Sequence, residues 1–175
     1  MTLEQASQQG YIDLLYGDET QVAQTGFVPY GWQFDDEQVA IEVQKGKSIN
    51  CFGLLARSNQ FHYWLNRSNI NAQFVIDILD EFSWHITKVT VIVLDNARIH
   101  TARKFKQLLE IWQRRGLYIF YLPPYSPHLN IIERLWKEIK EGWIKPSDYC
   151  SADDLFYAFD RICANVGKNI RLNFQ

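Results

Sequence analysis

Short apolar runs alternate along the chain with segments in which apolar residues recur every three or four positions. Five runs are rich in apolar and β-branched residues and predict β-strands, at residues 11–16, 48–56, 60–66, 89–94 and 117–122. Gly17 is expected to end the first strand. Only residues 57–59 separate the second run from the third, which favours a hairpin. The fourth run, Val-Thr-Val-Ile-Val-Leu, is typical of a parallel strand buried on both faces.

Four further segments show helical spacing, at residues 71–82, 101–115, 130–141 and 151–166. Gly116 is placed to stop the second helix, and Ser151 with Asp154 forms a capping pattern at the start of the last. In the third helix, the residues expected to face the core are Leu129, Ile132, Leu135, Trp136 and Ile139. The first three strands are expected to be antiparallel, and the last two, each of which follows a helix, to be parallel. The predicted fold class is therefore α/β, with a mixed five-stranded sheet flanked by helices in a single domain over residues 1–175.

The composition is that of a folded, intracellular protein. Of the 175 residues, 47% are hydrophobic, which excludes disorder, yet no apolar stretch approaches the ~20 residues that cross a bilayer. The N-terminal segment is too polar for a signal peptide. Cys51, Cys150 and Cys163 are widely spaced and lack a CxxC pair, so neither a disulfide framework nor a cysteine zinc site is indicated. We expect a cytoplasmic protein with free thiols and no membrane contact.

The charge is unevenly distributed along the chain. The net charge of −2 argues at first against a nucleic-acid partner. Residues 1–95, however, hold 5 Lys and Arg against 12 Asp and Glu (net −7), whereas residues 96–145 hold 10 against 4 (net +6). Such asymmetry favours an anionic partner on one face of the protein. The alternative is a helix surface with ordinary, solvated lysines and arginines.

Three carboxylates occupy positions that suit a metal site. Asp18 follows the first predicted strand, Asp95 ends the buried fourth strand, and Glu133 lies in the first turn of the third helix. Ligands of open α/β sheets collect at the carboxyl ends of the strands. An all-oxygen set of this kind suits Mg²⁺ or Mn²⁺, and a pair of such ions supports phosphoryl transfer.

Each of these carboxylates also fits a purely structural role. Asp18 suits a turn, and Asp95 suits a cap for the segment that follows it. Glu133 suits a capping box with Asn130, or an ion pair with Lys137 one turn later. Spacing alone leaves these alternatives open.

The residues around two of the carboxylates add a more specific signal. Residues 94–100 read LDNARIH, and residues 121–137 read YLPPYSPHLNIIERLWK. Together they resemble the catalytic domain of transposases with an Asp-Asp-Glu (DDE) triad, most closely bacterial insertion-sequence transposases related to the Tc/mariner group. The resemblance covers residues 11–140 approximately. The family usually has Pro two residues before the Glu, where this chain has Ile131, and its match at the first Asp is short, so Glu19 is the alternative to Asp18.

This resemblance implies a ribonuclease H-like fold and a metal-dependent enzyme. Asp18, Asp95 and Glu133 would be the catalytic residues and would bind two Mg²⁺ (or Mn²⁺) ions. The implied reaction is hydrolysis at the transposon ends, followed by attack of the freed 3′-hydroxyl on target DNA. Candidates for contacts to DNA, each with a role as an ordinary structural or surface residue as the alternative, are Arg98, His100, Lys104, Arg134, Lys137 and Lys140. His100 is expected to open the second helix, where it could orient a site group instead of contacting DNA, with an ordinary helix-start histidine as the alternative.

The resemblance also implies a DNA-reading module that we do not expect within these residues. The first predicted strand begins about ten residues into the sequence, which is too few for the helix-turn-helix that precedes the family's catalytic domain. We expect that half to be separately encoded or fused, with transposon ends and target DNA as partners. A homodimer is compatible with the family, and the expected location is the bacterial cytoplasm, at the nucleoid. Two alternatives are an inactive remnant that binds DNA or oligomerises, and a structure-selective nuclease of the same fold.

Overall fold

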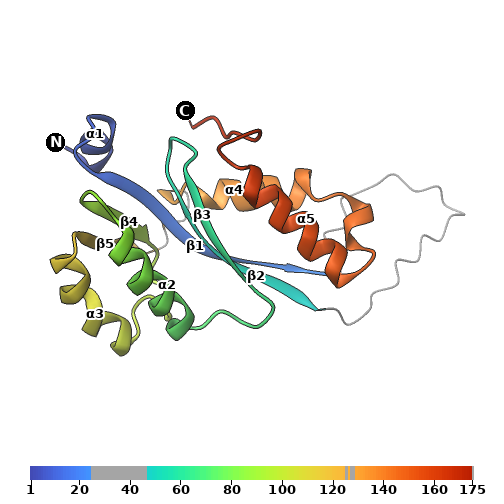
Figure 1. The fold of residues 1–175 in the computed structure, drawn as a ribbon, viewed down its shortest axis with the longest axis horizontal. Helices are drawn as coiled ribbons and strands as arrows, with labels where there is room; N and C mark the ends of the chain where they lie inside the picture. The colour runs from blue at the N-terminus through green and yellow to red at the C-terminus, as the bar shows by residue number, and fades with distance from the viewer. Residues whose placement is uncertain (25–46, 125, 127–128, 175) are drawn as a thin grey trace, which may run out of the picture.

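A five-stranded sheet lies between two layers of helices in the computed structural model, which describes residues 1–24, 47–124, 126 and 129–174 (Figure 1). The strands are β1 (Asp13–Ala23), β2 (Ser48–Leu55), β3 (Phe61–Asn66), β4 (Thr90–Leu94) and β5 (Leu117–Tyr121). Their order across the sheet is β3-β2-β1-β4-β5. β1 to β3 pair antiparallel, whereas β4 pairs parallel with both β1 and β5. The predicted mixed sheet and its β2–β3 hairpin are confirmed.

The helices are distributed over both faces of this sheet. They are α1 (Leu3–Gln8), α2 (Ala72–His85), α3 (Arg103–Arg114), α4 (Ile132–Glu138), the π-helical turn η2 (Ile139–Trp143), the 3₁₀ turn η3 (Pro146–Tyr149) and α5 (Ala152–Asn165). α2 and α3 cover one face, and α4 and α5 cover the other (Figure 1). The predicted cap of α5 forms, because the Ser151 side chain accepts a hydrogen bond from the backbone N–H of Asp154. None of the helices in the described part of the chain is long and apolar enough to cross a membrane.

The strand β4 lies between two hydrophobic cores and contributes side chains to both. All five of its residues are buried, as the continuous apolar run predicts. Val91 and Val93 contribute to the core beneath α4 and α5, whereas Ile92 and Leu94 contribute to the core beneath α2 and α3. The end of β4 is therefore packed on both faces of the sheet, and the residue that follows it is attached to a rigid strand.

Gly17 does not end β1, contrary to the prediction. The strand continues beyond it, and Asp18 is paired with Gly53 of β2 inside the sheet. A Cβ on Gly17 would lie 2.6 Å from Leu94 Cδ2 and 2.9 Å from Leu54 Cδ2, so the glycine allows leucines of two neighbouring strands to pack over β1. The expectation that Asp18 follows a strand is therefore wrong, because Asp18 lies within one.

The helix predicted at 130–141 begins later and changes its pitch. α4 starts at Ile132, and from Ile139 the chain forms the wider turn η2, which Ile144 closes by donating its backbone N–H to the Ile139 carbonyl at 3.0 Å. Four of the five residues expected to face the core are buried, namely Ile132, Leu135, Trp136 and Ile139. Leu129 is 45% exposed and lies before the helix, so its predicted burial is wrong.

Trp136 sets the distance between α4 and the sheet. Its buried indole packs edge-on against Phe61 of β3, with the ring centroids 5.9 Å apart. A Cβ on Gly53 of β2 would lie 2.8 Å from Trp136 Cη2 and 2.8 Å from Phe61 Cε2. The absence of a side chain at Gly53 therefore lets α4 approach the sheet closely, opposite Asp18.

Replacing Gly53 tests this close approach. Gly53→Ala is expected to lower the free energy of unfolding by about 1–3 kcal/mol, because a rigid indole and a phenyl ring must move to admit the methyl group. Urea unfolding followed by tryptophan fluorescence measures the loss. Gly142→Ala is the matched control, since a Cβ at Gly142 meets nothing within 4 Å. Equal stability of the two variants would contradict the proposed packing.

Candidate catalytic site

The three candidate carboxylates come from β1, from the end of β4 and from α4. Asp18 lies on the face of β1 that carries Tyr16 and faces α4, because successive side chains of a strand alternate. Asp95 immediately follows β4, the parallel neighbour of β1. Glu133 is exposed in the first turn of α4. Residues distant in sequence thus approach one region at the edge of the central strands.

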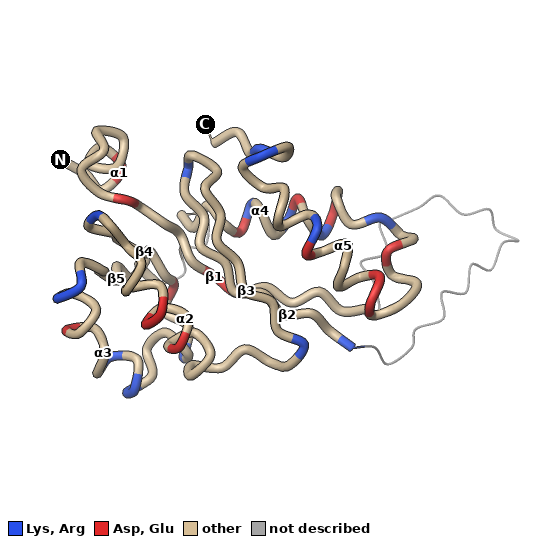
Figure 2. Tube along the Cα trace, viewed as in Figure 1, with Lys and Arg blue, Asp and Glu red and all other residues tan. Residues whose placement is uncertain are grey.

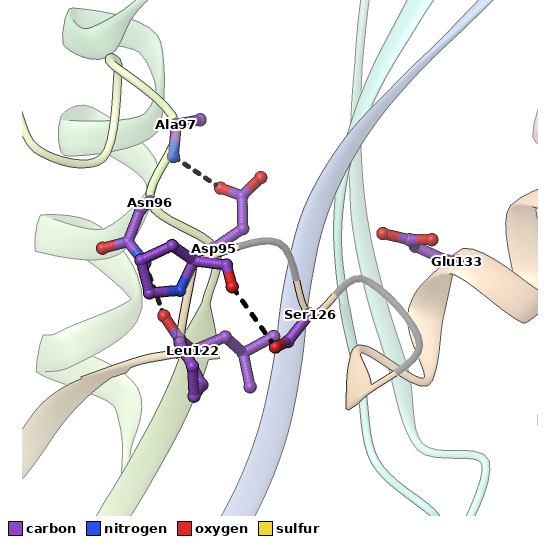
Figure 3. Close-up of a pocket in the computed structure, with 8 residues that line it drawn as sticks. Asp95, Asn96, Ala97, Leu122, Ser126 and Glu133 are labelled. Carbon is purple, nitrogen blue, oxygen red and sulfur yellow. Dashed lines mark hydrogen bonds between the residues drawn. The ribbon is translucent and has the colours of Figure 1, made fainter.

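Two adjoining cavities connect these carboxylates. The first, of about 430 Å³, is lined by Asp95, Pro123 and Glu133 among others, and Figure 3 shows Asp95 and Glu133 on opposite sides of it. The second, of about 340 Å³, is lined by Asp18, Glu133 and Lys140 among others. Glu133 is common to both cavities. A bound group that fills both would therefore contact all three carboxylates.

Asp95 is held in one orientation by bonds to a single oxygen. Its Oδ1 accepts the backbone N–H of Ala97 at 2.9 Å and lies 2.9 Å from Nδ1 of His100 (Figure 3 shows the first of these bonds). The hydrogen bond from His100 is the main reason why the pKa of Asp95 lies below its usual range. Oδ2 makes no hydrogen bond to the described residues, so it is the oxygen available to a cation.

His100 is buried, which the sequence did not indicate. The side chain is 0% exposed, its Nε2 lies 2.7 Å from Oε1 of Glu19, and α3 begins only at Arg103. Burial alone would lower the pKa of His100, but the hydrogen bonds to Asp95 and Glu19 outweigh burial and raise it to about 9. The expectation that His100 opens a helix is therefore wrong. Both of its ring nitrogens face carboxylates inside the protein, which favours the alternative that His100 orients a site group over a contact with DNA.

Asp18 lies in a region of concentrated negative charge. Burial is the largest cause that raises its pKa, to about 7, and the charges of Glu19, Asp95 and Glu133 raise it further. Within the described residues, no three His, Cys, Asp or Glu side chains come close enough to hold one metal ion. The donors are nonetheless all carboxylate oxygens, the ligand type of Mg²⁺ and Mn²⁺, and a cation would relieve the repulsion at Asp18. The donor chemistry therefore fits a divalent metal.

Asn130 joins the start of α4 to β1. Its Nδ2 donates a hydrogen bond to the carbonyl of Gly17 at 3.1 Å, and its side chain is buried. The capping box of Asn130 with Glu133 does not form, because Ile131 occupies the N-cap position without a side-chain cap. The asparagine is therefore used in a tertiary contact beside Asp18, which fixes where Glu133 can lie.

The candidate DNA-binding lysines and arginines are divided between the two sides of the sheet. Lys137 and Lys140 line the cavity of Asp18 and Glu133. Burial lowers the pKa of Lys140, which the charge of Asp18 opposes. Arg98 is exposed beyond β4, Lys104 is exposed on α3, and Arg134 donates to the carbonyl of Asn173 at 2.7 Å.

The basic stretch of the sequence therefore does not form one basic face. Figure 2 shows basic positions on α3 at one end of the molecule and on the α4 side at the other, with acidic positions between them. The expected anionic partner on one face stays a prediction, and it concerns only part of the basic stretch. Among the described residues that line the two cavities, the cationic ones are Lys137 of α4 and Lys140 of η2, whereas α3 covers the opposite face of the sheet.

The raised pKa of Asp18 has a measurable effect on the metal-free protein. A carboxyl with a pKa above its unfolded value lowers stability as pH rises from about 4 to about 7, because the unfolded chain ionises first. In EDTA at pH 8, Asp18→Asn is expected to be more stable than wild type by about 1–3 kcal/mol, with the difference vanishing near pH 4. Urea unfolding across this pH range measures it. Asp153→Asn, which removes an exposed carboxylate, should show no comparable trend, and a pH-independent difference for Asp18→Asn would contradict the assignment.

The chain matches one protein family and a group of solved structures. Residues 13–155 match the family of DDE superfamily endonucleases. No curated protein sequence matches the chain. Among solved structures, the chain is similar to the Mos1 transposase paired-end complex with left transposon end, with 18% identity, a TM-score of 0.66, and coverage of 93% of this chain and 51% of that one.

Two further structures share the fold over most of the chain. The catalytic domain of Mos1 mariner transposase is 17% identical, with a TM-score of 0.57 and coverage of 93% and 75% of the two chains. The catalytic core domain of BIV integrase is 14% identical, with a TM-score of 0.55 and coverage of 90% and 84%. These neighbours confirm the predicted ribonuclease H-like fold.

The extent of the family match settles the family of the chain. The chain itself spans about half the length of the Mos1 transposase chain in the paired-end complex. The matched segment 13–155 contains all three candidate carboxylates and covers most of the sequence. The chain belongs to the DDE superfamily endonucleases.

Proposed function

We propose that this chain is the catalytic domain of a DDE-type transposase, which cleaves DNA at transposon ends and joins the freed 3′-hydroxyl to target DNA. The observation that carries the proposal is the placement of Asp18, Asp95 and Glu133 around two adjoining cavities that share Glu133. Family membership supports it, because the motifs that carry the resemblance contain Asp95 and Glu133.

In this function the three carboxylates hold two Mg²⁺ or Mn²⁺ ions. When bound, such ions activate a water or hydroxyl nucleophile and stabilise the leaving oxygen. Asp95 is suited to this task because it is ionised and presents Oδ2, while Oδ1 is held by Ala97 and His100. Two related Mos1 complexes, described with Mn and with Mg, support the choice of metals.

DNA is the proposed substrate and partner. The related Mos1 complexes are described with transposon ends or as a strand transfer complex. In this chain, Lys137 and Lys140 line the cavity beside Asp18 and Glu133, where cationic side chains can hold backbone phosphates. Recognition of specific ends would require a helix-turn-helix half, separately encoded or fused, and the domain could act as a homodimer. The proposed site of action is the bacterial cytoplasm, at the nucleoid.

Cleavage and joining of DNA test the proposed function. In Mg²⁺ or Mn²⁺, the wild-type protein together with its DNA-binding half is expected to cut DNA that bears the element's terminal repeats and to join the 3′-hydroxyl end to a target plasmid. Asp95→Ala should reduce both steps roughly 10²-fold or more, because it removes charge stabilisation from the reacting phosphate. Asp153→Asn is the surface control. Gel analysis of end-labelled DNA follows both steps.

Each other outcome has a distinct meaning. Cleavage of branched or flapped DNA without joining would favour a structure-selective nuclease. An absence of cleavage with retained DNA binding would favour an inactive remnant. Equal activity of wild type and Asp95→Ala would show that the triad assignment is wrong.

The position of Lys140 predicts a specific change in DNA affinity. Lys140→Gln is expected to weaken DNA binding for all sequences and to reduce the slope of log Kd against log salt concentration by about 1, because one phosphate contact is lost. Arg114→Gln is the control, since Arg114 is exposed on α3, behind the opposite face of the sheet. Fluorescence anisotropy of labelled duplex DNA between 50 and 200 mM salt, roughly the range in which such slopes are resolved, measures both variants. An unchanged slope for Lys140→Gln would exclude this contact.

A further inference from the structure

His100 connects two carboxylates that come from different segments of the chain. Its Nδ1 faces Oδ1 of Asp95 at 2.9 Å, and its Nε2 faces Oε1 of Glu19 at 2.7 Å. Asp95 follows β4, whereas Glu19 lies within β1. The three side chains therefore form a continuous hydrogen-bonded series around the buried His100, here called the Glu19–His100–Asp95 brace.

Two aromatic rings and a hydrogen bond to its backbone hold His100 in place within this brace. The rings of Phe52 and Phe105 flank it, with centroid distances of 6.5 and 6.2 Å. Tyr121 donates its hydroxyl to the backbone carbonyl of His100 at 2.7 Å. These contacts favour the ring orientation in which Nδ1 faces Asp95.

Packing alone does not account for a polar group at this position. His100 borders the apolar core beneath α2 and α3, which contains Phe52 and Phe105. Replacing a buried ion pair by apolar side chains of similar volume is often neutral or stabilising. A histidine between two carboxylates at this place therefore indicates a role in orienting one of them.

We propose that Glu19 and His100 are positioning residues, which hold Oδ1 of Asp95 so that Oδ2 faces the metal site. Glu19 does not bind metal in this scheme but holds His100 from the side opposite to Asp95. Partners of this kind around metal ligands fix the ligand's orientation, and losing them typically weakens metal affinity 10–100-fold. The inference rests on the proposed function, because it assigns Asp95 as a metal ligand.

Two substitutions of His100 separate orientation from packing. The amide nitrogen of Asn occupies the place of Nδ1, so His100→Asn can still donate to Asp95 but cannot reach Glu19. The amide nitrogen of Gln occupies the place of Nε2, so His100→Gln can still reach Glu19 but leaves Asp95 without its partner. Both variants lose the ring and one of its two hydrogen bonds, and both should be destabilised to a similar extent in EDTA.

Mn²⁺ binding, followed by the EPR signal of free Mn²⁺, is the measurement. We expect His100→Gln to weaken Mn²⁺ affinity 10–100-fold and His100→Asn to remain within about threefold of wild type. Glu19→Ala should weaken affinity about tenfold, and Glu19→Gln should restore it, because its amide oxygen still accepts from His100. His62→Gln, a half-buried histidine on β3, is the control and should bind like wild type.

The possible results distinguish a failure of the proposed positioning role from a failure of the proposed function. Equal loss of affinity in both His100 variants, or no loss in either, would overturn the positioning role of His100. An equal loss in Glu19→Gln and Glu19→Ala would show that Glu19 acts through its charge and would overturn its part. If wild type itself bound no Mn²⁺, the proposed function would fail and the brace with it. If Asp95→Ala abolished binding while the brace variants bound normally, only the brace would fail.

Discussion

The side chains of two adjacent acidic residues, Asp18 and Glu19, lie on opposite faces of the sheet, because successive side chains of a strand alternate between the faces. Asp18 faces α4 and the cavity of Glu133, whereas Glu19 reaches His100 beside the other hydrophobic core. This alternation requires β1 to remain a regular strand through Gly17, where leucines of both neighbouring strands pack closely. If β1 ended at the glycine, neither side chain would have a defined direction.

The remaining carboxylate depends on how α4 is attached to that sheet. Trp136 packs into the space that Gly53 leaves open, and Asn130 donates to the Gly17 carbonyl. The packing of Trp136 against Gly53 sets the distance between α4 and the sheet, and the hydrogen bond of Asn130 sets the position of α4 along β1. The position of Glu133 therefore depends on two contacts that involve neither metal nor DNA. Asp95 is oriented separately, by the backbone N–H of Ala97 and by His100.

Patterns within a short stretch of sequence were sufficient for much of the fold. The apolar run at β4 identified the central strand, and the serine before α5 identified its cap, because burial on two faces and capping both leave local signatures. The short helix α1 was missed, although Thr2 and Gln5 form a capping box that is visible in the sequence. Its six residues are too few and too polar to show helical periodicity.

The errors have a common physical origin in contacts between distant segments. Gly17 was taken to end a strand because glycine often does so, but here it admits leucines from other strands. Asn130 fits a capping box locally, yet its side-chain amide donates a hydrogen bond to the carbonyl of Gly17, which is far away in sequence. The burial of His100 could not be predicted either, because it depends on Glu19 of β1, which is far away in sequence. The motif residues could be located from sequence, and His100 could be named as a residue that orients one of them, but its partner Glu19 could not.

The separation of the carboxylates along the chain also affects when the site can form during synthesis. Asp18 enters the sheet with β1, but Glu133 is placed only after β4, β5 and α4 have been made. Contacts between residues this far apart form late, because closing long loops costs conformational entropy before the contacts compensate for it. A nascent chain that ends before α4 lacks the helix that carries the third carboxylate. The proposed site therefore cannot be complete until α4 has emerged from the ribosome, which requires most of the domain to have been synthesised.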